Sequence, residues 1–228
     1  GCSVAYSHMA ATVYNNRAYV IGGLDKQVGI ECQVYTSENN SWLFEFPSLP
    51  KGRFNSVCFV YRDSLYVFGG TDNSSNMNEI VRYDLSTQNS GEWTTIAKVN
   101  EANQRGGVAF VVEDKVYAGL GEKSNGIRNG FYVSSDSLTK WELIPSIPAQ
   151  LGVISSGVYD EQKKSFFMID NDGKIWEYNL TTEQWTSRSL WIRMKNYHMF
   201  MLDGSIYILG QDIYQKNKFT VYNPIWDN

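Results

Sequence analysis

Basic side chains recur just before apolar segments of this chain and could bind an anionic group. The sequence contains Lys51-Gly52-Arg53, Gln104-Arg105-Gly106 and Arg193-Met194-Lys195, each a few residues ahead of an apolar segment. A guanidinium group can donate two parallel hydrogen bonds to one carboxylate or phosphate, so three equivalent arginines could form a local anion site. The same arginines could instead cap carbonyl groups or pair with acids in neighbouring loops. The sequence alone does not decide between the two.

Acids and histidines make a weaker case for catalysis. The two histidines, His8 and His198, each stand at the start of an apolar segment, which favours a packed, hydrogen-bonded ring. No His-x-x-x-His, Cys-x-x-Cys, Gly-x-Ser-x-Gly or Walker-type spacing occurs, and residues 170–173 are better interpreted as a hairpin turn than as a calcium loop. We therefore expect no catalytic residue, no metal and no cofactor. Carboxylates that could act beside the arginines are Asp72, Glu79, Glu101 and Glu122.

A short strand pattern that ends in glycine recurs along the chain and must position these side chains. It is clearest at residues 64–70, Ser-Leu-Tyr-Val-Phe-Gly-Gly, and related stretches begin at Arg17, Lys115, Ser165 and Ser205. A spacing of 40 to 51 residues between copies indicates a repeat architecture. The aromatic residues at the centre of the five copies are Tyr19, Tyr66, Tyr117, Phe167 and Tyr207.

Each copy predicts four antiparallel strands, here named a to d. An apolar segment and a tight polar turn precede the repeated strand, so strands a and b form a hairpin. A tyrosine marks strand c, and a tryptophan marks the start of strand d. We expect glycines Gly22, Gly23, Gly69 and Gly70 to be structural, because an aromatic ring can lie flat against a backbone that lacks side chains. The marker residues are Tyr35, Tyr83, Tyr132, Tyr178 and Tyr222, followed by Trp42, Trp93, Trp141, Trp185 and Trp226.

The glycine pair with a spaced tyrosine and tryptophan, as in Gly22-Gly23, Tyr35 and Trp42, resembles the kelch repeat. The resemblance implies an all-β, kelch-type β-propeller whose strands a line a central channel. We expect one domain over residues 1–228, with repeats at about 8–50, 51–103, 104–149, 150–190 and 191–228. The last blade is expected to lack its fourth strand. Five blades that close imperfectly and a portion of a longer propeller both remain open.

In such a propeller the b–c loops and the d–a linkers emerge on one face around the mouth of the channel. Their polar composition, with an occasional aromatic, is typical of a protein-binding rim. The resemblance implies a non-catalytic scaffold whose partner is another protein, and the arginines favour an acidic segment. The alternative is a carbohydrate-binding protein similar to kelch proteins that mutarotate sialic acid, with an acidic sugar as ligand. The predicted binding residues are Lys51, Arg53, Asn55, Asp72, Arg105, Arg128, Arg193 and Tyr214.

Composition narrows the function classes further. The net charge of -4 and the pI near 5.3 argue against a nucleic-acid partner, and no apolar run is long enough to cross a bilayer. Three cysteines are an odd number, and Cys32 and Cys58 fall in expected strands, so we expect buried free thiols. Free thiols favour the cytoplasm. An extracytoplasmic location stays open because Gly1-Cys2-Ser3 resembles a lipoprotein processing site.

Overall fold

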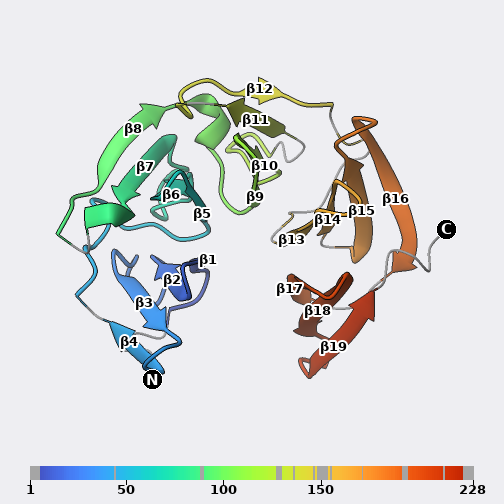
Figure 1. Ribbon diagram of the computed structural model, residues 1–228, viewed down its shortest axis with the longest axis horizontal. Coiled ribbons are helices and arrows are strands. Elements are labelled where there is room, and N and C mark those ends of the chain that lie inside the picture. The colour runs from blue at the N-terminus through green and yellow to red at the C-terminus, as the bar shows by residue number, and fades with distance from the viewer. Residues whose placement is uncertain are drawn as a thin grey trace.

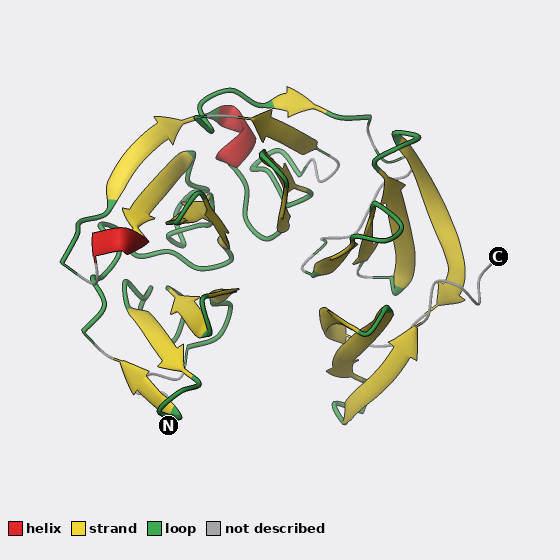
Figure 2. Cartoon of the chain, in the orientation of Figure 1, coloured by secondary structure: helices red, strands yellow, loops and turns green. Residues whose placement is uncertain are grey.

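The computed structural model consists of five antiparallel sheets arranged around a central channel (Figure 1). Strands and loops make up nearly all of it, and the only helical segments among the described residues are two short 3-10 turns (Figure 2). The predicted all-β propeller is therefore confirmed. The structure describes residues 6–43, 45–87, 90–126, 130–135, 137–145, 147, 154, 156–170, 172–191, 195–212 and 214–222.

Each sheet is built from consecutive strands, so one repeat forms one sheet. Sheet 1 contains β1 (Ala10–Tyr14), β2 (Arg17–Ile21), β3 (Cys32–Thr36) and β4 (Ser41–Leu43). Sheet 2 contains β5 (Val57–Tyr61), β6 (Ser64–Phe68), β7 (Glu79–Asp84) and β8 (Thr94–Lys98), with η1 (Leu85–Thr87) and η2 (Asn100–Ala102) beside it. Sheet 3 contains β9 (Val108–Val112), β10 (Lys115–Gly119), β11 (Phe131–Ser135) and β12 (Glu142–Leu143). Sheet 4 contains β13 (Gly157–Asp160), β14 (Ser165–Ile169), β15 (Lys174–Asn179) and β16 (Gln184–Trp191). Sheet 5 contains β17 (Lys195–Leu202), β18 (Ser205–Gln211) and β19 (Asn217–Tyr222), so the expected three-stranded last sheet is what the described residues form.

The first strands of the sheets face the channel, and the outer strands lie on the rim (Figure 1). Neighbouring inner strands contact one another from β1 to β5, from β5 to β9 and from β13 to β17. The five sheets form an arc that is open between sheet 1 and sheet 5 in this view.

The a–b hairpins turn as tightly as the sequence predicts. Asn15 and Asn16 have φ values of 47° and 58°, and Arg62 and Asp63 have values of 46° and 55°. Two successive positive φ values match the right-handed twist of the flanking strands. Asparagine tolerates this conformation well, whereas Arg62 occupies it less readily. The hairpin geometry fixes the register of strands a and b, so it determines which side chains share a face.

Sheets 2, 3 and 4 bury apolar side chains on both faces against their neighbours, and sheets 1 and 5 each do so on one face. We call the face that carries the central aromatic residue of strand b the forward face, and the opposite face the backward face. Tyr66 and Phe68 on the forward face of sheet 2 belong to one core cluster with Val116 and Ala118 on the backward face of sheet 3. Full burial of one large apolar side chain contributes about 1.5–3 kcal/mol, so stacking of the sheets supplies much of the stability.

The first glycine of each pair, Gly22 or Gly69, makes room for backbone atoms and not for an aromatic ring, which corrects the sequence-based explanation. A Cβ atom on Gly69 would lie 2.5 Å from the carbonyl oxygen of Ala102 and 2.7 Å from that of Gln104. The amide of Gly70 donates a hydrogen bond of 2.9 Å to Gln104 O. In the first repeat the same place is taken by the carbonyl of Arg53, 2.3 Å from a Cβ on Gly22. Each pair therefore receives the linker that enters the next repeat.

The marker aromatics pack on each other across strands c and d. The ring centroids of Tyr83 and Trp93 are 5.5 Å apart, and Trp93 Nε1 donates 2.9 Å to Pro47 O of the preceding repeat. In the third repeat Trp141 departs from this pattern and packs on Phe68 of sheet 2, with a centroid distance of 5.2 Å. The marker residues therefore join neighbouring repeats. Two further pairs are Tyr35–Trp42 and Tyr178–Trp185, whereas Trp226 lies outside the described residues.

Candidate functional site

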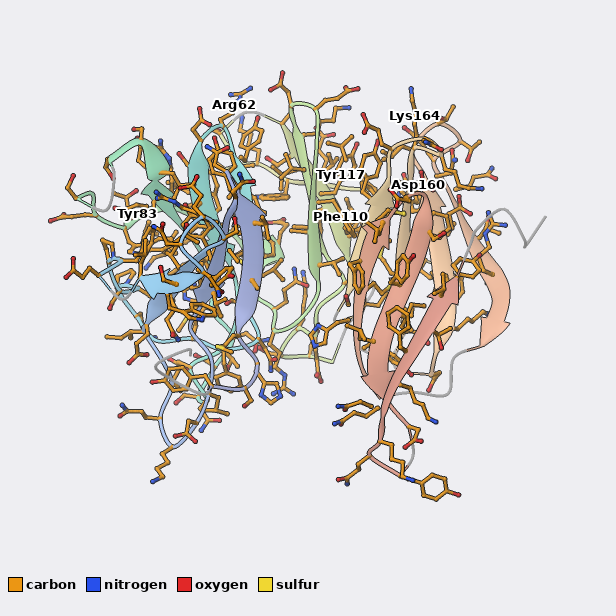
Figure 3. All side chains as sticks on the ribbon, turned by 60° about the horizontal axis from the view of Figure 1, so that its bottom comes forward. Arg62, Tyr83, Phe110, Tyr117, Asp160 and Lys164 are labelled. Atoms are coloured by element: carbon orange, nitrogen blue, oxygen red, sulfur yellow. The ribbon has the colours of Figure 1, made fainter. Side chains whose placement is uncertain are left out.

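The loop face of the propeller, formed by the b–c loops and the d–a linkers, is held together by short bridges between them. Phe54 pairs with Thr71, and Arg105 pairs with Glu122, so each linker is fixed against the b–c loop of its own repeat. The a–b turns lie at the other end of the channel, where Arg62, Asp160 and Lys164 are labelled at the top of Figure 3. The predicted binding residues that the structure describes therefore stand on one face.

Arg53 is fully buried, which corrects the prediction that it contacts a partner. Its side chain has 0% exposure; Nη1 donates 3.1 Å to Gly69 O, and Nη2 donates 3.4 Å to Glu79 Oε2. Burial lowers the pKa of the guanidinium, and the Glu79 carboxylate opposes this shift. Arg53 thus ties the linker between sheets 1 and 2 to the second glycine pair, and it presents no donor on the surface.

Arg105 is half exposed and paired with an acid of its own repeat. Its Nη2 lies 3.1 Å from Glu122 Oε2, and its backbone amide donates 3.0 Å to Glu122 O. The pairing with a loop acid is one of the two outcomes that the sequence left open. A surface ion pair is worth little in free energy, so it is easily exchanged for another carboxylate.

Lys51 and Asp72 form the matching pair in the second repeat. Lys51 Nζ lies 2.7 Å from Asp72 Oδ2, and Asp72 Oδ1 accepts the amides of Ser74 and Ser75, each at 3.0 Å. These contacts hold the carboxylate at a fixed place in the loop. The hydrogen bond from Lys51 and the two backbone hydrogen bonds lower the pKa of Asp72 to about 2.

We expect the carboxyl of Asp72 to titrate near pH 2, and Lys51→Ala to raise that pKa toward its ordinary value of 3.8. Because the pKa is depressed in the folded state, the stabilising effect of this group is present above pH 3.8 and is lost as pH falls through about 2. NMR titration of the side-chain carboxyl measures both values. An unchanged pKa in the variant would show that the backbone donors, and not Lys51, cause the shift.

Four described ion pairs of this face, unlike the Arg53–Glu79 pair, combine an exposed cation with a more deeply buried carboxylate. The cations are 49–65% exposed, whereas their carboxylate partners are only 16–23% exposed. The outer layer of the loop face is therefore basic, even though the chain carries a net charge of -4. We call Lys51, Lys98, Arg105 and Lys218 the outer cations; they pair with Asp72, Glu79, Glu122 and Asp212.

Sequence reasoning missed two of the outer cations. Lys98 ends β8, and Lys218 stands near the start of β19, so neither lies in the linker pattern that marked the arginines. Glu79 is the register partner of Lys98 on the neighbouring strand, and Asp212 begins the b–c loop that leads to Lys218, so an acid at these facing positions is the signal that could have found them. Lys98 faces Glu79 at 3.4 Å, and Lys218 faces Asp212 at 3.7 Å.

The remaining predicted residues divide into three kinds. Asn55 is part of the backbone frame, because its amide donates 3.0 Å to His8 O and its carbonyl accepts 2.7 Å from Gly106 N. Tyr214 is 76% exposed on the b–c loop of sheet 5, where its amide bonds to Asp212. Arg128 and Arg193 lie outside the described residues. Tyr214 is therefore an exposed aromatic on the loop face.

The channel holds a second candidate at the end of the a–b turns. A cavity of about 560 Å³ is lined by β1, β5 and β9 and by Tyr159. Its rim carries Arg62, which lies 3.4 Å from Asp114 and 4.9 Å from the centre of the Tyr61 ring. At this rim the guanidinium of Arg62 and the carboxylate of Asp114 are therefore already paired with each other. Sequence reasoning assigned no site here.

The chemistry of metals and thiols adds no further candidate. Within the described part of the chain, no three His, Cys, Asp or Glu side chains come together as potential metal ligands. Cys32 and Cys58 are buried free thiols, as expected, and burial raises the pKa of Cys32 to about 12. Asp170 accepts 2.8 Å from Gly173 N at its carbonyl and 2.9 Å from Trp176 Nε1 at Oδ2, whereas Asn171 lies outside the described residues. None of the helical segments described is long and apolar enough to span a membrane.

Comparisons with known proteins point to one repeat type. The family model described as the KLHDC2/KLHL20/DRC7 Kelch-repeats domain matches residues 2–151. Kelch-like protein 36 of Mus musculus is 27% identical over 165 residues, which cover 67% of this chain and 26% of that protein. Kelch repeat and BTB domain-containing protein 1 of Ectromelia virus (strain Moscow) is 25% identical over 227 residues, covering 94% of this chain and 39% of the viral protein. The chain thus spans well under half the length of these relatives.

A solved structure shows the same architecture. The structure of YjhT superposes with a TM-score of 0.78 at 15% sequence identity, and the match covers 96% of this chain and 84% of that one. At this identity the likeness concerns the fold.

Proposed function

Because this chain belongs to the kelch-repeat family, we propose that it is a non-catalytic scaffold whose loop face binds another protein through an acidic segment. The observation that supports this proposal is the basic outer layer of that face. Four cations reach outward from carboxylates that lie deeper, so an incoming acid meets the cations first. The corrected site consists of the outer cations and Tyr214, with Arg53 and Asn55 supporting it from within.

Binding of an acidic segment would add a second carboxylate to each cation of this layer. Each outer cation remains about half exposed while it is paired, so it can bind a second carboxylate without leaving the first. The exposed ring of Tyr214 offers an amphipathic contact of the kind that is enriched at protein interfaces. Electrostatic attraction of this type raises the association rate and weakens as salt increases.

An acidic sugar is less well supported as the ligand. Holding one sugar carboxylate between arginines needs at least two exposed guanidinium groups around one hollow. Of the predicted arginines that the structure describes, Arg53 is buried, so Arg105 is the one guanidinium among them that is exposed on this face. The described geometry therefore favours a peptide, whose several carboxylates can reach cations from different repeats.

The test uses a short fluorescent oligoglutamate peptide and fluorescence anisotropy. Reversing the outer cations to glutamate is expected to weaken binding by at least about tenfold, because several charge pairs are lost together. The control reverses Arg17, Lys115, Lys163 and Lys164, four cations of the a–b turn end, and changes the net charge by the same amount. Equal weakening by both variants, or no binding by the unmodified chain, would contradict the proposal. Binding of free sialic acid in place of the peptide would favour the sugar.

The prediction of a reducing compartment is kept as part of this proposal. Two thiols, Cys32 and Cys58, are free and buried in the core between sheets 1 and 2. A cytoplasmic location would preserve them.

A further inference from the structure

The cavity at the a–b turn end of the channel plays no part in the proposed function. Its volume of about 560 Å³ lies within the range of about 300–1,000 Å³ that is typical of small-molecule sites. Three neighbouring inner strands, β1, β5 and β9, form its wall, and they lie side by side around the channel (Figure 1). The loop face lies at the other end of the channel, so an occupant of this cavity does not rest on the proposed function.

The wall of the cavity is mostly apolar. Small aliphatic side chains from all three inner strands line it. A polar group placed against this wall would lose hydrogen bonds to water, so a ligand that fills the cavity needs a hydrocarbon part. The aliphatic side chains are Ala11, Val13, Val60, Ala109 and Val111.

The mouth of the cavity carries an excess of negative charge. The a–b turns of sheets 2 and 3 supply three carboxylates, Asp63, Glu113 and Asp114, and one guanidinium, Arg62. Three carboxylates against one guanidinium leave two negative charges uncompensated. The cations that begin β2 and β10 do not line the cavity. A ligand with a cationic end therefore fits the charge of the mouth.

Arg62 shows how a cation is held at this mouth, where it is labelled at the top of Figure 3. Its Nη2 lies 3.4 Å from Asp114 Oδ1, and its guanidinium carbon lies 4.9 Å from the centre of the Tyr61 ring. The hydroxyl of Tyr61 donates 3.1 Å to the backbone oxygen of Asp114, which fixes the ring beside the acid. Arg62 thus combines an ion pair with a cation–π contact.

Glu113 is the carboxylate of the mouth that is left for a ligand. Asp114 is paired with Arg62, and Asp63 accepts a hydrogen bond from the hydroxyl of Tyr14. The carboxylate of Glu113 forms no hydrogen bond or ion pair with any residue that the structure describes.

Tyr159 supplies a ring that faces the same cavity from β13. Burial raises the pKa of its phenol, and the carboxylates of Glu161, Glu113 and Asp160 raise it further. The negative potential of the mouth therefore extends to this ring. An ammonium group between Glu113 and Tyr159 would have the same two kinds of contact that Arg62 has.

We propose that this cavity binds a linear aliphatic amine. The ammonium group lies between Glu113 and Tyr159, and the hydrocarbon chain lies against the aliphatic wall. An alcohol of the same length lacks the ion pair, and a carboxylate of the same length is repelled by the charge of the mouth.

The test titrates the chain with n-hexylammonium and follows the backbone amide signals by two-dimensional NMR. Saturable shifts are expected at β9, at the turn that follows it and at Tyr159. Hexanol and hexanoate have the same hydrocarbon chain and are expected to bind at least about threefold more weakly. Hexanol that binds as tightly as hexylammonium, or hexylammonium shifts confined to the loop face, would overturn the proposal.

Variants of Glu113 and Tyr159 test the two contacts separately. Glu113→Gln keeps the size of the side chain and is expected to weaken hexylammonium binding about three- to fivefold, with less than about a twofold effect on hexanol. Tyr159→Leu is expected to weaken hexylammonium binding about two- to fivefold, whereas Tyr159→Phe keeps the ring and should stay within about twofold of the unmodified chain.

Asp203→Asn is the matched control for Glu113→Gln. It removes the same charge from the exposed a–b turn of sheet 5, which does not line the cavity, so binding is expected to stay within about twofold. Equal weakening by the two variants would show that affinity follows net charge alone and would overturn the proposal. An unmodified chain that shows no saturable shift at the cavity would overturn it as well. Thermal melts confirm that each variant is folded.

Discussion

Replacing Gly69 with alanine is expected to lower the free energy of unfolding by about 2 to 5 kcal/mol. Two costs combine. Gly69 has a φ of 62°, a conformation that costs any other residue roughly 1–2 kcal/mol. In addition, the new Cβ would lie 2.5 Å and 2.7 Å from the carbonyl oxygens of Ala102 and Gln104. These are backbone atoms of a linker that is hydrogen-bonded to Gly70, so they cannot move aside cheaply. Urea denaturation monitored by tryptophan fluorescence measures the loss.

Gly204→Ala separates the two costs. Gly204 has a φ of 73°, similar to that of Gly69, but no heavy atom lies within 4 Å of its ideal Cβ position. Its alanine variant is expected to lose only about 1–2 kcal/mol, the cost of the backbone conformation. Equal losses in the two variants would show that the glycine pair is needed for its φ alone, and that the close approach of the linker is unimportant.

The spacing of the repeats in the sequence was enough to predict the fold, but it did not predict why the glycine pairs are needed. Strand b was located correctly in each repeat, because alternating apolar residues bounded by turn residues are a local signal. The partner of the glycine pair is not local. The carbonyl of Gln104 reaches Gly70 from the linker of the next repeat, and only the path of that linker brings the two together.

The two arginines show that prediction from the sequence was limited at the binding site as well. Arg53 and Arg105 occupy similar places in the sequence, yet one is fully buried and the other is half exposed. The two arginines are offset by one residue. Arg53 corresponds to buried Gln104, because both give their carbonyl to a glycine pair, whereas Arg105 corresponds to Phe54, because both pair with the b–c loop of their own repeat. The spacing in the sequence was not accurate to one residue, so it could nominate both arginines but could not separate them.

The exposed faces of sheets 1 and 5 show a further limit of prediction from the sequence. The forward faces of sheets 2 and 5 have nearly the same pattern of side chains, so no sequence feature distinguishes the covered one from the exposed one. A repeat that is locally complete can lack a neighbour, and only the arrangement in space reveals it.

Removing either partner of the Arg53–Glu79 pair is expected to be strongly destabilising. Glu79→Gln leaves a buried guanidinium without its counter-ion and should cost about 2 to 4 kcal/mol; the lower half of this range is favoured because Glu79 is 23% exposed. Arg53→Met leaves the carbonyl of Gly69 without its side-chain donor and should cost about 2 to 3 kcal/mol. Combining the two should cost less than their sum by about 1 to 2 kcal/mol, since the second change removes a charge that the first has left unpaired.

A double-mutant cycle in urea denaturation measures this coupling. Arg105→Met is the control, because Arg105 forms a comparable but exposed pair with Glu122 and should lose no more than about 1 kcal/mol. Arg53→Met should also leave oligoglutamate binding within about twofold of the unmodified chain when measured well below its melting temperature, because a buried donor cannot reach a ligand. Additive losses in the cycle, or a large loss of binding in a fully folded Arg53→Met chain, would contradict the buried pair. Either result would support the sequence-based prediction that Arg53 contacts the partner.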